Sequence, residues 1–359
     1  MVMEKAIANN RLLKLSSYIA FVGIILITLL SVASELITGS LWLELASHFK
    51  VQYLILCLLL FGILLLSQRQ TTTIVISLFC LIIIATEILP WYLPQHSSLA
   101  VAGTNRTVNG TINPTVPLKV INSNILLLNR NYDKVLSFVR ADKPDIAIFI
   151  EVDEAWAKKL ATLKDILPYS TDLPLSFDLG IAVFSRLPLK NIAVEYFDTD
   201  SNPSQFKRAS IVADLEIEGQ TISLIATHPA TPIKPRVFNS RNIQLEAIAK
   251  YIHTLKHPVV MAGDLNITMW SPYYRKFISD AGLHNAREGF GILPTWPTNK
   301  AQSRLVARIS KLVAIPIDHC LVSPAIAVQN IRTGPNVDSD HLPLITDLLI
   351  PIKGTEIGT

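Results

Sequence analysis

Three long apolar runs occupy the first hundred residues, and they restrict the possible folds more than any other feature of the chain. They cover about 15–37, 51–67 and 73–93. A helix needs roughly 20 apolar residues to cross the hydrocarbon core of a bilayer. The sequence therefore predicts a membrane anchor over 1–93 with three transmembrane helices. A signal peptide followed by core helices is the alternative, but three successive runs disfavour it.

Basic residues predict how this anchor is oriented. The N-terminal tail carries three cations and the loop after the second run carries Arg69, whereas Lys50 in the first loop is offset by Glu44. The positive-inside rule places the N-terminus and the Arg69 loop in the cytoplasm. An odd number of spans then places everything after residue 93 outside the cytoplasm.

Composition changes twice after the apolar runs. Residues 94–117 are rich in Ser, Thr, Asn, Gly and Pro, which predicts a flexible linker. From 118 to 352, short apolar runs alternate with helical segments, which predicts one layered α/β domain. Cys320 is the only cysteine there, so a disulfide within the domain is excluded. The expected strands include LKVINSNIL, PDIAIFIEVD, LGIAVFSRLPL, RASIVADLEIEG, QTISLIATHP, PVVMAGDLN, IDHCLVS and HLPLITDLLI, and the expected helices NYDKVLSFVRAD and EAWAKKLATL.

Acids, amides and histidines stand where these apolar runs stop. Ligands gather at strand ends in α/β sheets, so these side chains are expected to converge. Any one of them alone would more often be a turn, cap or hydrogen-bonded core residue, and only their conjunction predicts a site. The set comprises Asn124, Glu151, His228, Asp264, Asn266, Asp318, His319, Asp340 and His341.

These residue types indicate metal-assisted chemistry on a phosphate ester. Carboxylate and amide oxygens suit Mg²⁺, and histidines beside acids can stabilise or protonate a phosphoryl oxygen. The sequence has neither a G-x-S-x-G nucleophile turn nor an H-E-x-x-H zinc helix, so water is the expected nucleophile.

One stripe of basic residues does not identify what it binds. Arg304, Arg308 and Lys311 recur at helical spacing beside apolar residues. They could contact anionic lipid or nucleic-acid phosphates, although a solvated helix face is the commoner explanation. The net charge of +4 gives no strong indication of a nucleic-acid partner.

The motifs NSN, PDIAIFIEVD, GIAVFSRLPL, ATHP, GDLN, IDHCLVS and SDHLPL, in this order, resemble the endonuclease/exonuclease/phosphatase family. The resemblance covers about 117–350 and is greatest to bacterial membrane-anchored members. The sequence PTWP is also similar to that group. It implies a DNase I-like four-layered α/β sandwich, with two packed mixed β-sheets flanked by helices. It also implies dependence on Mg²⁺ or Mn²⁺.

The same resemblance assigns expected roles to individual residues. Glu151 matches the family's metal ligand, Asn124 the amide that supports metal and phosphate, and Asp340 an acid near the metal. Ile150 replaces the family's usual Gln, and no second acid follows Asn124, so a single metal is expected.

The remaining matches concern water and phosphate. Asp264 matches the acid that orients or deprotonates the attacking water, and Asn266 its partner on the phosphate. His228 matches a phosphate contact. His341 matches the general acid or charge stabiliser, and Asp318 matches the acid that holds it.

Together these inferences predict an integral membrane phosphodiesterase or phosphomonoesterase, with its catalytic domain outside the cytoplasm of a bacterium. An N-glycosylation sequon at Asn266 overlaps GDLN. A glycan attached there would block the site, which favours a bacterial source. The expected partners are the lipid bilayer and a phosphate-ester substrate, which is either a phospholipid head group or a nucleic acid. No obligate protein partner is evident. The alternative is a sensor or scaffold that binds phosphorylated ligands without turnover.

Overall fold

The computed structural model describes residues 2–67, 70–93, 105–108, 111–175, 179–197, 208–298 and 310–352. The chain forms two compact units. Unit 1 comprises Met1–Pro90 with the short segment Met269–Pro272, and unit 2 comprises the remainder.

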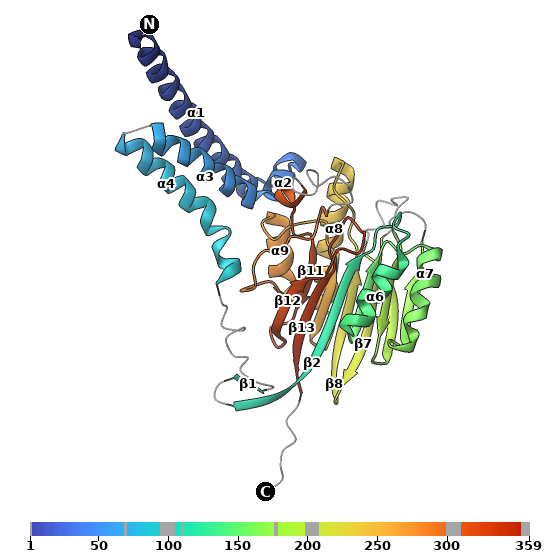
Figure 1. Cartoon of the computed structure of the whole chain (residues 1–359). Helices are drawn as coiled ribbons and strands as arrows, with labels where there is room; N and C mark the ends of the chain where they lie inside the picture. The colour runs from blue at the N-terminus through green and yellow to red at the C-terminus, as the bar shows by residue number, and fades with distance from the viewer. Residues whose placement is uncertain are drawn as a thin grey trace. The chain divides into compact units, whose positions relative to one another are not determined.

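Unit 1 is helical (Figure 1). Its long helices α1 (Val2–Leu36), α3 (Lys50–Ser67) and α4 (Thr71–Thr86) pack against one another. Two described helices, Arg11–Leu36 of α1 and the whole of α3, are long and apolar enough to cross a membrane. The expected third span is not confirmed, because α4 has 16 residues and a length of only about 24 Å. The short elements are α2 (Leu41–Ser47) and η1 (Leu89–Tyr92).

Lys50 was expected in the loop between the first two apolar runs, but it begins α3 and is fully buried. Its ammonium donates to the carbonyl and hydroxyl oxygens of Ser31 at 2.8 and 3.0 Å, and Glu35 lies 3.9 Å away. A buried charge needs such partners. Lys50 therefore belongs to the interior of the helical unit and is not a loop charge.

Unit 2 contains two mixed sheets (Figure 1). The seven-stranded sheet has the order β12-β13-β2-β3-β5-β4, with β1 added to β2, and the six-stranded sheet has the order β10-β11-β9-β8-β7-β6. Only β2–β3 and β8–β9 are parallel among the described pairs. The strands are β1 (Asn105–Val108), β2 (Thr111–Asn124), β3 (Ile146–Ile150), β4 (Tyr169–Leu173), β5 (Ile181–Ser185), β6 (Leu189–Tyr196), β7 (Ala209–Ile217), β8 (Gln220–Thr227), β9 (Val259–Asp264), β10 (His284–Asn285), β11 (Asp318–Val322), β12 (Ala327–Thr333) and β13 (Leu344–Pro351).

Residues facing alternate sides of β3 show why its sequence is continuously apolar. Ile146, Ile148 and Ile150 join the core between the sheets, whereas Ala147 and Phe149 join a second core beneath the helices. A strand covered on both faces has no polar side. Two packed mixed sheets with flanking helices confirm the predicted DNase I-like α/β sandwich.

Helices cover the outer faces of both sheets (Figure 1). α6 (Tyr132–Asp142) and α7 (Glu154–Leu160), the latter continued by η2 (Ala161–Asp165), pack on the seven-stranded sheet. α8 (Pro235–Ile252) and α9 (Pro272–Ala281) lie beside the six-stranded sheet. The expected helices NYDKVLSFVRAD and EAWAKKLATL correspond to α6 and α7.

The predicted linker extended to residue 117, but β2 already begins at Thr111. Pro117 pairs only with β13, because the pairing of β2 with β3 starts at Val120. A proline removes one hydrogen-bond donor and is tolerated where a strand has a free side. The end of the expected linker is therefore part of the sheet.

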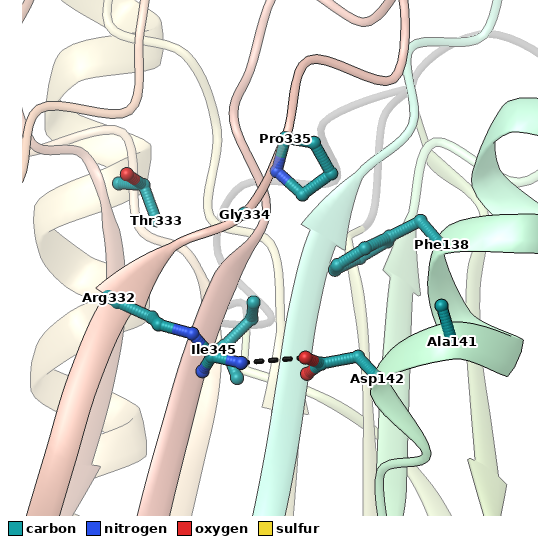
Figure 2. A pocket seen from close by; sticks show the side chains of 8 residues that line it. All are labelled: Phe138, Ala141, Asp142, Arg332, Thr333, Gly334, Pro335 and Ile345. Atoms are coloured by element: carbon teal, nitrogen blue, oxygen red, sulfur yellow. Dashed lines mark hydrogen bonds and ion pairs between the residues drawn. The ribbon is translucent and has the colours of Figure 1, made fainter.

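A surface pocket of about 240 Å³ lies between α6 and the strands β12 and β13 (Figure 2). Arg332 donates to Asp142 across it at 2.6 Å. Gly334 forms part of its wall, and a Cβ at this position would lie 3.1 Å from the Phe138 ring. None of the predicted site residues lines this pocket.

We expect Phe149→Ala to lower the free energy of unfolding by about 3–5 kcal/mol, because Phe149 is fully buried between β3 and the helix layer. Chemical denaturation of the full chain in detergent, followed by near-UV circular dichroism, measures this loss. Ile192→Ala on edge strand β6, where the side chain is 45% exposed, is the matched control with a small expected effect. Equal stability of the two variants would contradict this packing.

Candidate active site

The carboxyl ends of the two parallel strand pairs carry predicted site residues. In the seven-stranded sheet, β2 ends at Asn124 and β3 leads directly to Glu151. In the six-stranded sheet, β8 leads to His228 and β9 ends at Asp264. Adjacent parallel strands end at the same edge of a sheet, so each pair of strands presents two functional side chains together.

Close backbone approaches accompany both acids. A Cβ on Gly263, beside Asp264, would lie 1.8 Å from the carbonyl oxygen of Thr227. Glu151 donates its amide to Gly180, where a Cβ would likewise lie 1.8 Å from a carbonyl oxygen. Only glycine fits such approaches. Glu151 itself has a φ of 67°, an uncommon conformation that is often found at functional sites.

Asp264 lies at the centre of the site and is almost fully buried. Its Oδ2 accepts a hydrogen bond from the amide of Asn124 at 3.2 Å. The Nε2 atoms of His228 and His341 lie 3.6 and 3.7 Å from the same oxygen. Burial raises the pKa of Asp264 to about 7, although the nearby His341 acts to lower it.

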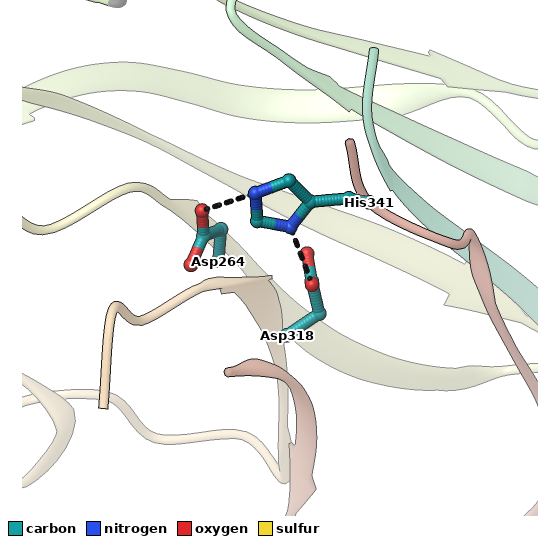
Figure 3. A group of neighbouring side chains, drawn as sticks. All are labelled: Asp264, Asp318 and His341. Atoms are coloured by element: carbon teal, nitrogen blue, oxygen red, sulfur yellow. Dashed lines mark hydrogen bonds and ion pairs between the residues drawn. The ribbon is translucent and has the colours of Figure 1, made fainter. Parts of the chain in front are cut away.

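His341 is held by Asp318, as Figure 3 shows. Its Nδ1 lies 2.8 Å from Asp318 Oδ2. Burial alone would lower the pKa of His341, but the carboxylates of Asp318 and Asp264 outweigh this effect and raise it to about 10. The two carboxylates thus favour the imidazolium form of the ring, whose Nε2 faces Asp264 Oδ2 at 3.7 Å.

His228 has the opposite kind of partner. The guanidinium of buried Arg208 lies 3.1 Å from His228 Nδ1. Arginine has donors and no acceptor, so Nδ1 must accept and cannot carry a hydrogen. The His228 ring is consequently neutral, with its hydrogen on Nε2. Two histidines thus flank Asp264, one fixed by a carboxylate and the other by a cation.

Asn266 is bonded to the same centre through its backbone. Its amide N–H donates to Asp264 Oδ1 at 2.9 Å, and its side chain donates to the carbonyl of Pro229 at 3.0 Å. Arg241 of α8 donates to the carbonyl of Asn266 at 2.8 Å. These three hydrogen bonds hold the turn in place, with Asn266 at a φ of 51°.

Glu151 and Asp340 are the residues that best fit a divalent cation. Burial raises the pKa of Glu151, and the charge of Asp340 contributes to the rise. Asp340 Oδ2 lies 3.4 Å from the indole nitrogen of Trp296, whereas its buried Oδ1 has no hydrogen-bond partner among the described residues. Two neighbouring acids with such an oxygen suit a hard cation.

Asn124 is placed to orient these acids. Its Nδ2 donates to Glu151 Oε1 at 2.9 Å as well as to Asp264, and its Oδ1 accepts from the amide of Leu126. The amide oxygen is therefore engaged by the backbone. In this geometry Asn124 supports the acids through its donor group.

A second combination, Asp264, Asp318 and His341, also offers ligand atoms within 4.8 Å of one another. His341 Nδ1 is already hydrogen-bonded to Asp318 Oδ2 at 2.8 Å. We therefore interpret this group as a hydrogen-bonded triad and not as the metal site.

Of the side chains expected to converge, the described structure brings all but His319 to one place. It adds partners that the sequence did not reveal. Asn122 lies two residues before Asn124, on the same face of β2, and donates to Asp318 at 3.4 Å. Ser339 donates to the carbonyl of Asn124 and accepts from the amide of His341. Strand periodicity was the available signal for Asn122, whereas no pattern marked Arg208.

His319 lies outside this constellation and has a structural environment. It is fully buried, and its Nε2 lies 2.8 Å from the carbonyl of Ile267. Its Nδ1 accepts from Asn285 and Arg287 at 3.1 and 3.3 Å. Burial and the charge of Arg287 hold the pKa of His319 well below its ordinary value. The ring links β11 to the turn that follows Asp264.

Comparisons with known proteins agree with this fold. The sequence model of the Endonuclease/Exonuclease/phosphatase family matches residues 110–341, which is more than half of the chain. A comparison with curated protein sequences finds no match.

Several solved structures share the fold at low sequence identity. Zebrafish (D. rerio) TDP2 in complex with a single-strand DNA product has 15% identity and a TM-score of 0.54, covering 65% of this chain and 98% of that one. The human Nocturnin catalytic domain with bound sulfate has 20% identity and a TM-score of 0.53, covering 66% and 97%. An endonuclease/exonuclease/phosphatase from Beutenbergia cavernae has 21% identity and a TM-score of 0.51, covering 66% and 72%.

We expect Arg208→Met to release the tautomer of His228. In the unmodified chain, the ¹⁵N spectrum of His228 should show one neutral form with hydrogen on Nε2, because Arg208 cannot accept a hydrogen bond. The variant should show mixed tautomers. Arg140→Met, which changes a half-buried arginine paired with Asp165 away from His228, is the control. A spectrum of His228 that is unchanged in the Arg208 variant would contradict the assignment.

We also expect His319 to destabilise the fold in acid. The pKa of His319 is lower in the folded state than its unfolded value of about 6.5. Above that pH, His319 is neutral in both states and costs no stability. As pH falls from there toward the folded-state pKa, only the unfolded state gains the proton, so the free energy of unfolding decreases. Melting temperatures of the chain and of His319→Gln, measured between about pH 4 and pH 8, test this sign. The variant should lose less stability over this range. A steeper loss in the variant would be the contrary result.

Proposed function

This chain belongs to the Endonuclease/Exonuclease/phosphatase family, and we propose that it is a divalent-metal-dependent phosphoesterase that uses water as its nucleophile. The observation that supports this most directly is the buried cluster around Asp264. The cluster contains two acids suited to a cation, Glu151 and Asp340. It also contains two histidines beside Asp264, of which we take His341 as charged and His228 as neutral. The overall reaction forms one P–O bond from water and breaks one P–O ester bond, and the leaving alcohol takes up a proton.

The substrate phosphate would be bound by donors from both sides of Asp264. The Nε2–H of His228 is a fixed neutral donor, and Arg208 behind it adds positive charge without access to the reacting atoms. Asn266 supplies a side-chain amide at the same turn. Preorganised donors of this kind stabilise the negative charge that develops on phosphoryl oxygens.

Proton movement would be divided between an acid and a base. Asp264 Oδ2 is the carboxylate oxygen that orients the attacking water and receives its proton. His341, held by Asp318, carries the proton that the leaving oxygen requires. The two histidines have different roles because their partners differ: His341 is bonded to an acid and His228 to a cation.

Glu151 and Asp340 would hold one Mg²⁺ or Mn²⁺. Asn124 would fix the positions of the Glu151 and Asp264 carboxylates through its hydrogen bonds to both. When bound, such a cation neutralises phosphoryl charge and helps to orient the ester.

We further propose that unit 1 anchors the enzyme in a bacterial inner membrane. Two long apolar helices support this, and α4 would be a short third span. The basic N-terminal segment would then lie in the cytoplasm and unit 2 outside it. The bilayer would be the main partner of the chain, with no obligate protein partner required.

The test is hydrolysis of bis-p-nitrophenyl phosphate by the full chain in detergent, with Mg²⁺ or Mn²⁺ and with EDTA. We expect EDTA to abolish turnover. We expect His341→Ala and Asp264→Ala to lower kcat about 10²- to 10³-fold while the melting temperature shows a folded protein.

His253→Ala is the matched control, because this exposed histidine at the end of α8 lies outside the site. Wild-type rates in a folded His341 or Asp264 variant would overturn the proposed mechanism. Tight binding of phosphate esters by the intact chain without any turnover would instead support a sensor or scaffold.

A further inference from the structure

Two loops hold the candidate metal ligands Glu151 and Asp340. One is the β2–α6 loop, residues 125–131, and the other is the β12–β13 loop, residues 334–343. The β2–α6 loop binds Glu151, because the amide of Leu127 donates to Glu151 Oε2 at 2.9 Å. The β12–β13 loop contains Asp340 itself. The separation of the two acids therefore depends on how the two loops are joined.

Asp338 of the β12–β13 loop accepts three hydrogen bonds that join it to the start of α6. Its Oδ2 accepts from the side-chain amide of Asn131 at 2.7 Å. Both of its carboxylate oxygens also lie 2.8 Å from the ammonium of Lys134, in the first turn of α6. Beside these bonds, the side-chain amide of Asn129 donates to the carbonyl of Val337 at 3.1 Å. We call Asp338, Asn131 and Lys134 the loop clamp.

The backbone of Asp338 is held in an uncommon conformation. Its φ is 65°, in the left-handed region that residues with a side chain seldom adopt. Its amide donates to Asn336 Oδ1 at 2.7 Å. The turn is thus fixed by one bond on the amide and by the loop clamp on the carboxylate. Glycine would adopt this φ more easily, but it has no group that could join the loop to α6.

Asp340 depends on this loop more than His341 does. The amide of His341 donates to the buried hydroxyl of Ser339 at 3.1 Å, and its ring is bonded to Asp318 at 2.8 Å. The Asp340 carboxylate has one long hydrogen bond among the described residues, of 3.4 Å, to the indole of Trp296. The position of the Asp340 carboxylate is therefore set mainly by the backbone that carries it.

The loop clamp lies at the surface, which limits what it can contribute. The side chains of Lys134 and Asp338 are 51% and 43% exposed. Exposed ion pairs contribute little to the free energy of unfolding. A divalent cation such as Mg²⁺ is more demanding, because it requires its ligands in a near-ideal octahedral arrangement. A small displacement of one ligand is therefore expected to weaken metal binding while the fold stays intact.

We propose that the loop clamp positions the metal site by fixing Asp340 relative to Glu151, with Asp338 as the central positioning residue. This inference rests on the proposed function, because it takes Glu151 and Asp340 as ligands of the divalent cation. Residues bonded directly to metal ligands contribute roughly 10- to 100-fold to metal affinity. Asp338 acts through the backbone of the loop, so a smaller contribution is expected.

Direct metal binding tests the loop clamp without any substrate. The full chain in detergent is freed of metal and titrated with Mn²⁺, and free Mn²⁺ is measured by electron paramagnetic resonance. The relevant site is the one that Asp340→Asn removes. We expect Asp338→Gly and Lys134→Met each to raise the Kd for Mn²⁺ about 3- to 10-fold. The melting temperature of both variants should stay within about 2 °C of the unmodified chain.

Charge alone predicts a different pattern. Removing the cation of Lys134 would strengthen Mn²⁺ binding, and removing the anion of Asp338 would weaken it. The loop clamp predicts weaker binding in both variants, and no further loss in the double variant, because the two side chains form one contact. Lys190→Met is the matched control, since Lys190 is also 51% exposed and is paired with Glu216 at 2.6 Å on β6 and β7. Its Kd should change by less than about 2-fold.

The outcomes separate this inference from the function on which it rests. An unchanged or lower Kd in Lys134→Met, or an equal rise in the Lys190 control, would overturn the loop clamp. A chain that binds Mn²⁺ through Asp340 but hydrolyses no ester would contradict the proposed function, and the Kd values would still decide the role of the loop clamp. Absence of Mn²⁺ binding that depends on Asp340 would overturn both.

Discussion

Hydrogen bonds between the two sheets hold the candidate site together. Asn124 at the end of β2 donates to Asp264 at the end of β9, and Asn122 on the same face of β2 donates to Asp318 of β11. All four side chains are buried, so each bond is formed in a low-dielectric interior where an unmade bond would be costly. These bonds form only when the two sheets are packed face to face. The apolar core between the sheets is therefore a precondition for the arrangement of the polar groups.

Much of unit 2 could be predicted from local pattern. β3 and β9 are continuous apolar runs because both faces are covered, and polar residues that follow such runs fall at a sheet edge. Edge strands were harder to predict. β6 has an exposed, mixed pattern, and β4 and β12, also at edges, were not expected. The start of β2 was hidden by prolines that an unpaired side of the strand tolerates.

The site was predictable in composition but less so in detail. Acids, amides and histidines at strand ends could be identified because strand periodicity and topology bring them together. Their orientations depend on residues far away in sequence, and sequence spacing does not encode these contacts. Arg208 determines the tautomer of His228, and Trp296 contacts Asp340 across 44 positions. The positive φ of Glu151 is likewise set by its surroundings, because a glutamate does not favour that conformation.

The length of β2 has a mechanical consequence. This strand continues for 14 residues from Thr111 to Asn124 and pairs antiparallel with β13 from Thr115 to Asn122. Tension applied to the N-terminal end of β2 along the strand axis would load the β2–β13 ladder in shear, so that its hydrogen bonds would have to break together. The strand β2 can thus bear load while Asn124, at its far end, keeps its position.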